Sequence, residues 1–468
     1  MAPANRRLAS PPPPPTHTKK KKKTKTKTNT KKQKQVLERS GLSPLGTYLP
    51  AAIHPAHAKE PKIDMATAML EAEAVMGGAV SDLLAKTGLK PDDVDILVTN
   101  CSIFCPTPSL ASMLINKFKF RQDVQAYNLG GMGCSIGVVA VGLVRDLLQA
   151  HPRANLVFVP AEVTTYCFYP GRQKDLMVAN AIFRMGGAAS YFTNKPHMRH
   201  AAKYALEHSV RVHTGQADAA FRCINWGPDA DGINGVYLGK DVPQQAGKML
   251  EAVIKAVTPK IMTWSQWLQA ASVVFQRKTL GWKSVPYFVP DYTSCCDHFA
   301  LHAGGYAVLK GIMAGMNLPV SAVMPSFAAL RDYGNTSSST TWYTMAYLES
   351  QALVKRGHRV MQVGAGGGMK GGVNVYRALR DLSDVHPAWR HCAGTPYVEA
   401  DLPRRIYESP EEEATALARQ AAVKAGATGA GRRAARASGA AAKKGVSVAA
   451  AVQHESELES KDLGVAAL

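Results

Sequence analysis

The amino-acid sequence predicts an α/β fold in which helices cover parallel strands, arranged as two similar halves. Three observations lead to this prediction. Short apolar runs alternate with segments of helical periodicity, the alternation passes through two rounds that divide near residue 200, and 46% of the residues are apolar. Alternation of this kind places parallel strands side by side with helices on their faces. The chain is therefore expected to have a large globular core.

The first half is expected to span residues 38–199. Its elements are a helix at Ala66–Lys86, a strand at Val94–Thr99, a helix at Leu110–Phe118, a strand at Val124–Leu129, a turn at Gly130–Gly133, a helix at Ser135–Leu148 and a strand at Asn155–Val163. Each strand is short and apolar, as strands buried beneath helices are.

The second half is expected to span residues 200–386. It begins with a strand at Ala205–His213, an irregular stretch through Trp226 and Gly235, and helices within Val242–Gln276. It continues with Val285–Pro290, helices at Asp297–Gly315 and Ser337–Arg356, and strands at Arg359–Val363 and Val373–Ala378 joined by a glycine loop. The two halves share this order but no repeated sequence.

Both ends of the chain have compositions typical of disorder. Residues 1–37 form a basic arm, and residues 1–39 carry a net charge of +12 out of +21 for the chain. Attraction to anionic lipid, nucleic-acid binding and nuclear import are alternative roles for such an arm. Residues 387–468 are expected to be a mostly disordered tail rich in Ala, Gly and Arg, with one helix at Pro410–Ala425.

The sequence has no apolar run of the ~18 residues that a membrane-spanning helix needs, and the apolar core of a secretory signal is missing near its start. We therefore expect no spanning helix. The eight unevenly spaced cysteines fit buried or reactive thiols in a reducing compartment better than a disulfide framework.

Cys134 is the strongest candidate nucleophile. It follows a strand that ends in Gly130-Gly131-Met132-Gly133 and precedes an apolar helix, so it is expected on a sharp turn. The N-terminus of a helix favours a thiolate and offers backbone N–H groups to an acyl oxyanion. A buried structural cysteine is the alternative for this pattern taken alone.

Two histidines and an asparagine are candidate partners of this thiol. His298 and His302 are spaced to share one face of the helix predicted at Asp297–Gly315. A core histidine is the alternative for His298, and a metal site with Cys295 and Cys296 is disfavoured because no glutamate follows His298 as in zinc proteases.

Asn335 lies in a glycine-punctuated loop that enters a helix capped by Thr336 or Ser337. An asparagine amide there can donate to a developing oxyanion. The glycine-rich segment Gly364–Gly368 lacks the Gly-Lys-Ser/Thr of a phosphate-binding loop, so it fits an acyl site better.

Several segments together resemble the plant-type 3-ketoacyl-CoA synthases over about residues 36–380. They are Asn128–Gly137, Asp297–Gly305, Gly334–Ser339, the late glycine loop, Arg39–Leu42, Thr47–Pro50, Asn100–Ser102, Pro106–Ser109 and Phe183–Gly187. The resemblance implies a thiolase-like fold with two related α/β halves in alternating α-β-α-β-α layers.

The resemblance also implies an acyltransferase of very-long-chain fatty acid biosynthesis, with a Cys-His-Asn site and no cofactor or metal. Cys134 would carry the acyl group of a long-chain acyl-CoA, while His302 and Asn335 would stabilise the enolate formed from malonyl-CoA as it loses CO2. The N–H groups of Cys134 and Gly367 would hold the acyl oxyanion. The expected product is a 3-oxoacyl-CoA longer by two carbons, with CoA and CO2.

By the same resemblance His213 and His298 would have supporting roles, and Arg331 stands where the family usually has a histidine. The implied state is a homodimer at the cytosolic face of the endoplasmic reticulum membrane, working with other fatty acid elongase components and without nucleic acid. Family members begin with two spanning helices and this chain with a lysine arm, so either the gene model is truncated or the protein is peripheral. The amphipathic stretch Ile261–Phe275 is a candidate contact with the membrane interface.

Three rival interpretations remain open at this point. A chalcone-synthase-like polyketide synthase would use the same triad for more extension cycles, and a cysteine hydrolase would release free acid without consuming malonyl-CoA. A non-catalytic protein that binds lipid surfaces or nucleic acid would act through the lysine arm.

Overall fold

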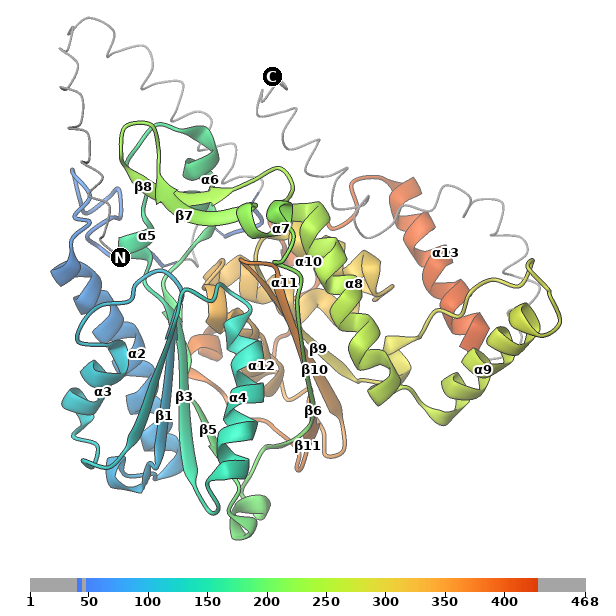
Figure 1. Ribbon diagram of the computed structural model, residues 1–468, viewed down its shortest axis with the longest axis horizontal. Coiled ribbons are helices and arrows are strands. Elements are labelled where there is room, and N and C mark those ends of the chain that lie inside the picture. The colour runs from blue at the N-terminus through green and yellow to red at the C-terminus, as the bar shows by residue number, and fades with distance from the viewer. Residues whose placement is uncertain (1–39, 44–47, 428–468) are drawn as a thin grey trace, which may run out of the picture.

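A computed structural model of the protein describes residues 40–43 and 48–427 (Figure 1). The basic arm predicted at residues 1–37, and residues 428–468 of the predicted tail, lie outside the described residues. The described helices are α2 (Met65–Thr87), α3 (Leu110–Phe118), α4 (Ile136–Ala150), α5 (Thr164–Cys167), α6 (Lys174–Ile182), α7 (Asp218–Arg222), α8 (Val242–Ile261), α9 (Trp264–Lys278), α10 (Tyr306–Gly315), α11 (Val320–Tyr333), α12 (Thr340–Ser350) and α13 (Pro410–Ala427). Short 3-10 turns include η2 (Pro196–His200), η4 (Ser337–Ser339), η5 (Pro387–Cys392) and η6 (Glu399–Asp401).

The strands form two main sheets and a hairpin. The first sheet has the order β2-β1-β3-β4, with β5 also paired to β3; its strands are β1 (Ile96–Cys101), β2 (Gln125–Gly130), β3 (Asn155–Glu162), β4 (Gly186–Gly187) and β5 (Ser190–Thr193). The second sheet has the order β6-β11-β10-β9, with strands β6 (Tyr204–His213), β9 (His298–Leu301), β10 (Arg359–Gly366) and β11 (Lys370–Ala378). Strands β7 (Ile224–Pro228) and β8 (Asn234–Leu238) form the hairpin.

Strands β1 and β3 of the first sheet are parallel and buried on both faces, and the side chains of β1 alternate between two apolar layers. Leu97 and Val157 pack toward α2 and α3, whereas Val98 and Phe158 pack toward α4. This alternation explains why the strands read as continuous apolar runs in the sequence.

The second sheet is enclosed in the same way. Val363 and Phe299 pack with α8, α10 and α11 on its outer side, whereas Val360 and Ala300 pack with α4 and α12 on its inner side. Helices α4 and α12 contact each other between the two sheets, as Figure 1 shows for α4. The molecule therefore has the five alternating α-β-α-β-α layers, and the predicted fold is confirmed.

The central layer is unusually close-packed where α4 meets the turn η4. A Cβ atom at Gly137 would overlap the carbonyl oxygen of Ser338, so only glycine fits there. The indole N–H of Trp342 donates to the carbonyl oxygen of Gly137 at 3.0 Å. These contacts hold the start of α4, next to Cys134, against the segment that carries Asn335.

The structure differs from the sequence-based predictions in several places. The helix predicted over Asp297–Gly315 begins only at Tyr306, because His298–Leu301 is the short buried strand β9 parallel to β10. A run as short as these four residues does not distinguish a strand from a helix by periodicity. Val285–Pro290 has no regular structure, and helix α11, which contains Pro325, was not predicted.

Residues 387–427 are ordered, in contrast to the mostly disordered tail expected from composition. Trp389 is fully buried, with its ring centroid 4.9 Å from those of Tyr333 and Tyr347, and Ile406 is fully buried as well. The predicted helix near residue 410 is present as α13. Aromatic contacts thus attach this segment to the second half, a feature that composition alone does not reveal.

None of the helices in the described part of the chain is both long enough and apolar enough to cross a membrane.

Candidate active site

Cys134 lies on the sharp turn that the glycines predict. Strand β2 ends at Gly130, and Gly131 and Gly133 adopt left-handed φ values of 67° and 71°. Helix α4 begins at Ile136, two residues beyond the thiol. The strand-turn-helix arrangement around Cys134 is therefore confirmed.

The glycine-rich segment of the second half packs directly on this turn. A Cβ atom at Gly133 would come within 2.7 Å of the backbone nitrogen of Gly367, and one at Gly366 within 2.8 Å of the backbone nitrogen of Cys134. Real Cβ atoms do not approach other backbone atoms so closely, which explains the glycines on both sides. The two halves of the fold thus meet backbone to backbone at the candidate nucleophile.

A cavity of about 710 Å³ opens at this junction. Cys134, His302 and Asn335 all line it, together with Gly367. Much of the remaining wall is apolar and includes Phe221, Trp226, Val236, Leu238 and Met249. A larger hollow of about 1980 Å³ lies beside α2, β5 and β6 and includes none of the predicted catalytic residues.

His302 follows β9 and is held by the second sheet. Its backbone N–H donates to the carbonyl oxygen of Val363 at 2.9 Å, and its Nδ1 lies 2.7 Å from the hydroxyl oxygen of Thr340. Burial lowers the pKa of His302 to about 4. The imidazole is therefore neutral at pH 7, with a lone pair on one ring nitrogen.

The side-chain amide of Asn335 is fixed at both ends. Its Oδ1 accepts from the backbone N–H of Ser337 at 2.8 Å, and its Nδ2 donates to the carbonyl oxygen of Gly304 at 3.0 Å. An asparagine amide carries two N–H groups, so one remains for a substrate oxygen. The amide of Asn335 therefore has a fixed orientation and offers one N–H group to the cavity.

The thiol of Cys134 is protonated at neutral pH, because burial raises its pKa to about 11. The nearby side chain of Ser337 opposes this rise, and the charge of Glu162 adds to it. Burial therefore outweighs the preference for thiolate that we expected from a helix N-terminus. A nucleophilic role for Cys134 requires a base.

The two supporting histidines lie in different places. His213 ends β6 and lines the cavity, where its Nδ1 accepts from the backbone N–H of Gly215 at 3.1 Å. His298 begins β9, does not line the cavity, and has its Nε2 3.0 Å from Nδ1 of His358. The expected shared helix face of His298 and His302 is wrong, since a strand separates them by about 13 Å.

Sequence reasoning missed three polar residues of the site: Glu162, Ser337 and Thr340. Glu162 lines the cavity at the end of β3 and accepts from the thiol of Cys101 at 3.1 Å. A single acidic residue at the end of an apolar strand is a sequence signal that could have identified Glu162. Ser337 and Thr340 were hidden in a run of Ser and Thr read as helix capping, although no capping side-chain hydrogen bond is present at η4 or α12.

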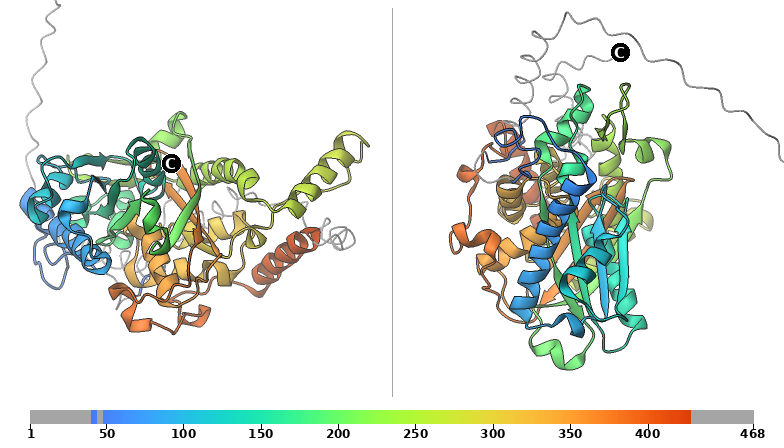
Figure 2. Two further views of the ribbon diagram at one scale, coloured as in Figure 1. Left: turned by 90° about the horizontal axis from the view of Figure 1, so that it is seen from below. Right: turned by 90° about the vertical axis from the view of Figure 1, so that its left-hand side faces the viewer.

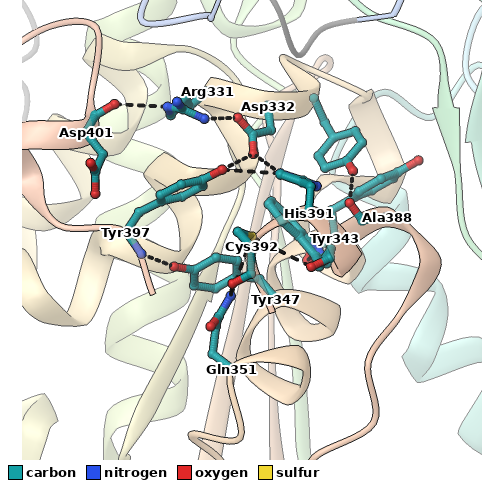
Figure 3. A network of polar contacts seen from close by, with 12 residues as sticks. Arg331, Asp332, Tyr343, Tyr347, Gln351, Ala388, His391, Cys392, Tyr397 and Asp401 are labelled. Carbon is teal, nitrogen blue, oxygen red and sulfur yellow. Dashed lines mark hydrogen bonds and ion pairs between the residues drawn. The ribbon is translucent and has the colours of Figure 1, made fainter. Parts of the chain in front are cut away.

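Arg331 does not line the cavity, and in Figure 3 its side chain lies beside Asp401 of the C-terminal segment. Its Nε donates to the carbonyl oxygen of Asp401 at 2.9 Å, and its guanidinium lies 4.5 Å from the ring centre of Tyr397. Asp332 joins the network by accepting from the hydroxyl of Tyr397 and by lying 2.9 Å from Nε2 of His391. Arg331 thus helps to attach residues 387–408 to α11.

The described residues contain no group of three or more His, Cys, Asp or Glu side chains placed to hold a metal ion. Cys295 and Cys296, the thiols of the disfavoured metal alternative, are both buried in the core beside α8.

Two family models match this chain. Residues 13–279 match the FAE1/Type III polyketide synthase-like protein family. Residues 293–378 match the C-terminal part of 3-oxoacyl-[acyl-carrier-protein] synthase III. Together the two matches span both halves of the fold.

Curated relatives cover most of the chain. The chain is 41% identical to 3-ketoacyl-CoA synthase 6 of Arabidopsis thaliana over 359 residues, which is 76% of this chain and 71% of that protein. It is likewise 41% identical to 3-ketoacyl-CoA synthase 4 of the same plant, over 76% of this chain and 69% of that protein.

Among solved structures, the fold resembles 1,3,6,8-tetrahydroxynaphthalene synthase of Streptomyces coelicolor, a type III polyketide synthase. The TM-score is 0.56 at 20% identity, covering 75% of this chain and 94% of that one. The type III polyketide synthase domain of Steely1 from Dictyostelium gives the same TM-score at 19% identity, covering 76% and 91%. These structures support the thiolase-like fold.

We predict that Gly366→Ala lowers the free energy of unfolding by ~1–3 kcal/mol, because the added methyl group would press on the backbone at Cys134. Urea unfolding followed by circular dichroism measures the change. Gly78→Ala in α2 is the control, since a Cβ there meets no atom within 4 Å and should be neutral or stabilising. A Gly366→Ala protein as stable as the wild type would contradict the close approach.

Proposed function

This chain belongs to the 3-ketoacyl-CoA synthase family, and from that premise we propose that it condenses malonyl-CoA with a long-chain acyl-CoA through a thioester on Cys134. The protein is thus an acyltransferase of the condensing type. The observation that carries the proposed mechanism is the convergence of Cys134, His302 and Asn335 on one largely apolar cavity. An apolar wall suits an acyl chain, and three polar groups suit the reacting carbonyls.

In the first step the Cys134 thiol gives its proton to Nε2 of His302, and the sulfur attacks the carbonyl carbon of the acyl-CoA. The bond from that carbon to the CoA sulfur breaks, and CoA leaves as a thiolate that takes a proton from solvent. The N–H groups of Cys134 and Gly367 hold the intermediate oxyanion. The close packing of these two backbones supports their joint role.

In the second step malonyl-CoA loses CO2, and the electrons of the broken carbon–carbon bond form an enolate. The free N–H of Asn335 and the protonated His302 stabilise the enolate oxygen. The enolate carbon attacks the thioester carbonyl and displaces the Cys134 thiolate. The product is a 3-oxoacyl-CoA two carbons longer than the starting acyl-CoA, as very-long-chain fatty acid biosynthesis requires.

We predict that Cys134→Ala lowers the rate of 3-oxoacyl-CoA formation by at least roughly 10³-fold, since the acyl group then has no nucleophile. The assay supplies radiolabelled malonyl-CoA with C16 to C20 acyl-CoAs. Cys105→Ala, which removes an exposed thiol, is the control and should keep activity near that of the wild type.

Each rival interpretation gives a different product in this assay. Free acid without malonyl-CoA consumption would identify a hydrolase, and products with several added units would identify a polyketide synthase. Unchanged condensation by Cys134→Ala would exclude the proposed mechanism.

The proposal includes peripheral association with the cytosolic face of the endoplasmic reticulum membrane. Helix α9 projects from the body in Figure 2 and exposes Trp264 (85%) and Leu268 (72%), and the following segment exposes Tyr287 (76%). The guanidinium of Arg277 lies 3.8 Å from the ring centre of Tyr287. Exposed Trp and Tyr beside basic residues are typical of contacts with anionic lipid headgroups.

Replacing Trp264, Trp267 and Leu268 together by Ser should reduce co-sedimentation with phosphatidylserine-containing vesicles by about tenfold or more, because the apolar area available for insertion is lost. Leu70→Ser, an exposed leucine on α2, is the control. A second variant lacking residues 1–35 measures the contribution of the basic arm. Unchanged vesicle binding by the triple variant would refute a role for α9.

The proposal also includes a homodimer that works with other fatty acid elongase components. Strand β5 lies at the end of the first sheet opposite β2, beside the hollow of about 1980 Å³. A free sheet edge of this kind is suited to pairing with a second copy. Sedimentation equilibrium should give twice the mass of one chain, and a single-chain mass would contradict the dimer.

A further inference from the structure

The imidazole of His302 has a buried hydroxyl as its hydrogen-bond partner. Thr340 is the first residue of α12, is 1% exposed, and places its Oγ1 2.7 Å from Nδ1 of His302. Among the residues that the structure describes, Thr340 is the one whose side chain forms a hydrogen bond with this ring. His302 itself is 4% exposed, so water has little access to the pair.

The same hydroxyl also lies within hydrogen-bonding distance of a carbonyl group. Oγ1 of Thr340 is 3.1 Å from the carbonyl oxygen of Ser337, with geometry suited to donation. A hydroxyl has only one proton to donate. Both contacts are hydrogen bonds at the same time only when Nδ1 of His302 carries a proton and donates it to Thr340.

These two hydrogen bonds determine which nitrogen of the neutral imidazole remains an acceptor. A neutral ring carries a single ring proton, and burial keeps His302 neutral at pH 7 by lowering its pKa. With that proton on Nδ1, Nε2 has a free lone pair. Nε2 lies on the side of Gly304, where an added Cβ would come within 2.8 Å of it, and both residues line the cavity with Cys134.

We propose that Thr340 is a positioning residue that keeps the ring proton of neutral His302 on Nδ1, so that Nε2 is free to accept the proton of the Cys134 thiol. The proposal rests on the proposed function for the role of His302 as a base. A protonated, buried thiol cannot react until a base takes its proton. The other titratable groups that line this cavity are Glu162, His213, Arg222, Tyr306 and Lys370.

Once His302 has taken the thiol proton, both hydrogen bonds of Thr340 remain in place. The imidazolium still donates from Nδ1 to Thr340, and it now also has a proton on Nε2 for the enolate oxygen. Thr340 neither gains nor loses a proton in this cycle. A hydroxyl at residue 340 therefore suits both protonation states of His302, whereas an aliphatic side chain would leave Nδ1 without a partner.

The tautomer can be measured directly on the wild-type protein. Solid-state ¹⁵N NMR of histidine-labelled protein at pH 7, with the His302 signal assigned by its loss in His302→Gln, should show a protonated Nδ1 and an unprotonated Nε2. A signal from the opposite tautomer, or from the charged ring, would overturn the proposal. This measurement needs no substrate, so it stands even when the condensation assay fails.

Substitution of Thr340 gives an independent test through the reactivity of Cys134. In Thr340→Val we expect iodoacetamide alkylation of Cys134 at pH 7, followed by peptide mass spectrometry, to slow about tenfold or more. The pH midpoint of alkylation should rise by about one unit. Thr340→Ser keeps the hydroxyl and should restore the rate to within about twofold of the wild type.

The neighbouring threonine provides a matched control. Thr341 is 2% exposed, and its hydroxyl oxygen accepts from Nε2 of Gln362 at 3.0 Å instead of contacting His302. Thr341→Val should therefore alkylate like the wild type. Thermal unfolding confirms that each variant is folded before its rate is compared. Wild-type alkylation by Thr340→Val, or an equal loss in Thr341→Val, would contradict the proposal.

Discussion

The site depends on the backbone contact between the Cys134 turn and the glycine-rich segment Gly364–Gly368, in which β10 ends. At Gly133 and Gly366 the two backbone segments lie too close together for a side chain to fit between them. The first half of the fold contributes the proposed nucleophile, and the second half brings the N–H of Gly367 beside it. Because the contact joins the two halves at the thiol, the relative position of the two sheets and the geometry of the candidate site are set together.

The central helical layer also fixes the positions of the other polar groups of the site. Helix α4 touches η4 through Gly137 and Ser338, which holds the turn at Cys134 against the segment that carries Asn335 and leads into α12. Asn335 is then held between Ser337 and Gly304, and His302 between Val363 and Thr340. The side chains of Asn335 and His302 are therefore anchored by backbone groups or a buried hydroxyl group, as preorganised sites for developing charge require.

The fold and the three proposed catalytic residues could be predicted from the sequence because their signals are local. Glycines with left-handed φ define the turn at Cys134, and buried strands read as apolar runs. The strand His298–Leu301 could not be separated from a helix, because it is too short for its period to be recognised. Thr340 could not be singled out within a run of six consecutive Ser and Thr residues. The attachment of residues 387–408 through Arg331 and Trp389 depends on tertiary contacts between distant segments.

The central claim is that Cys134 carries the acyl group between the two steps. The most direct measurement is peptide mass spectrometry of the protein after brief incubation with a C18 acyl-CoA in the absence of malonyl-CoA. The account predicts a thioester-linked C18 acyl group on the peptide that contains Cys134, which disappears when malonyl-CoA is added and 3-oxoacyl-CoA is released. An unmodified Cys134 peptide from protein that nevertheless forms 3-oxoacyl-CoA would contradict the account.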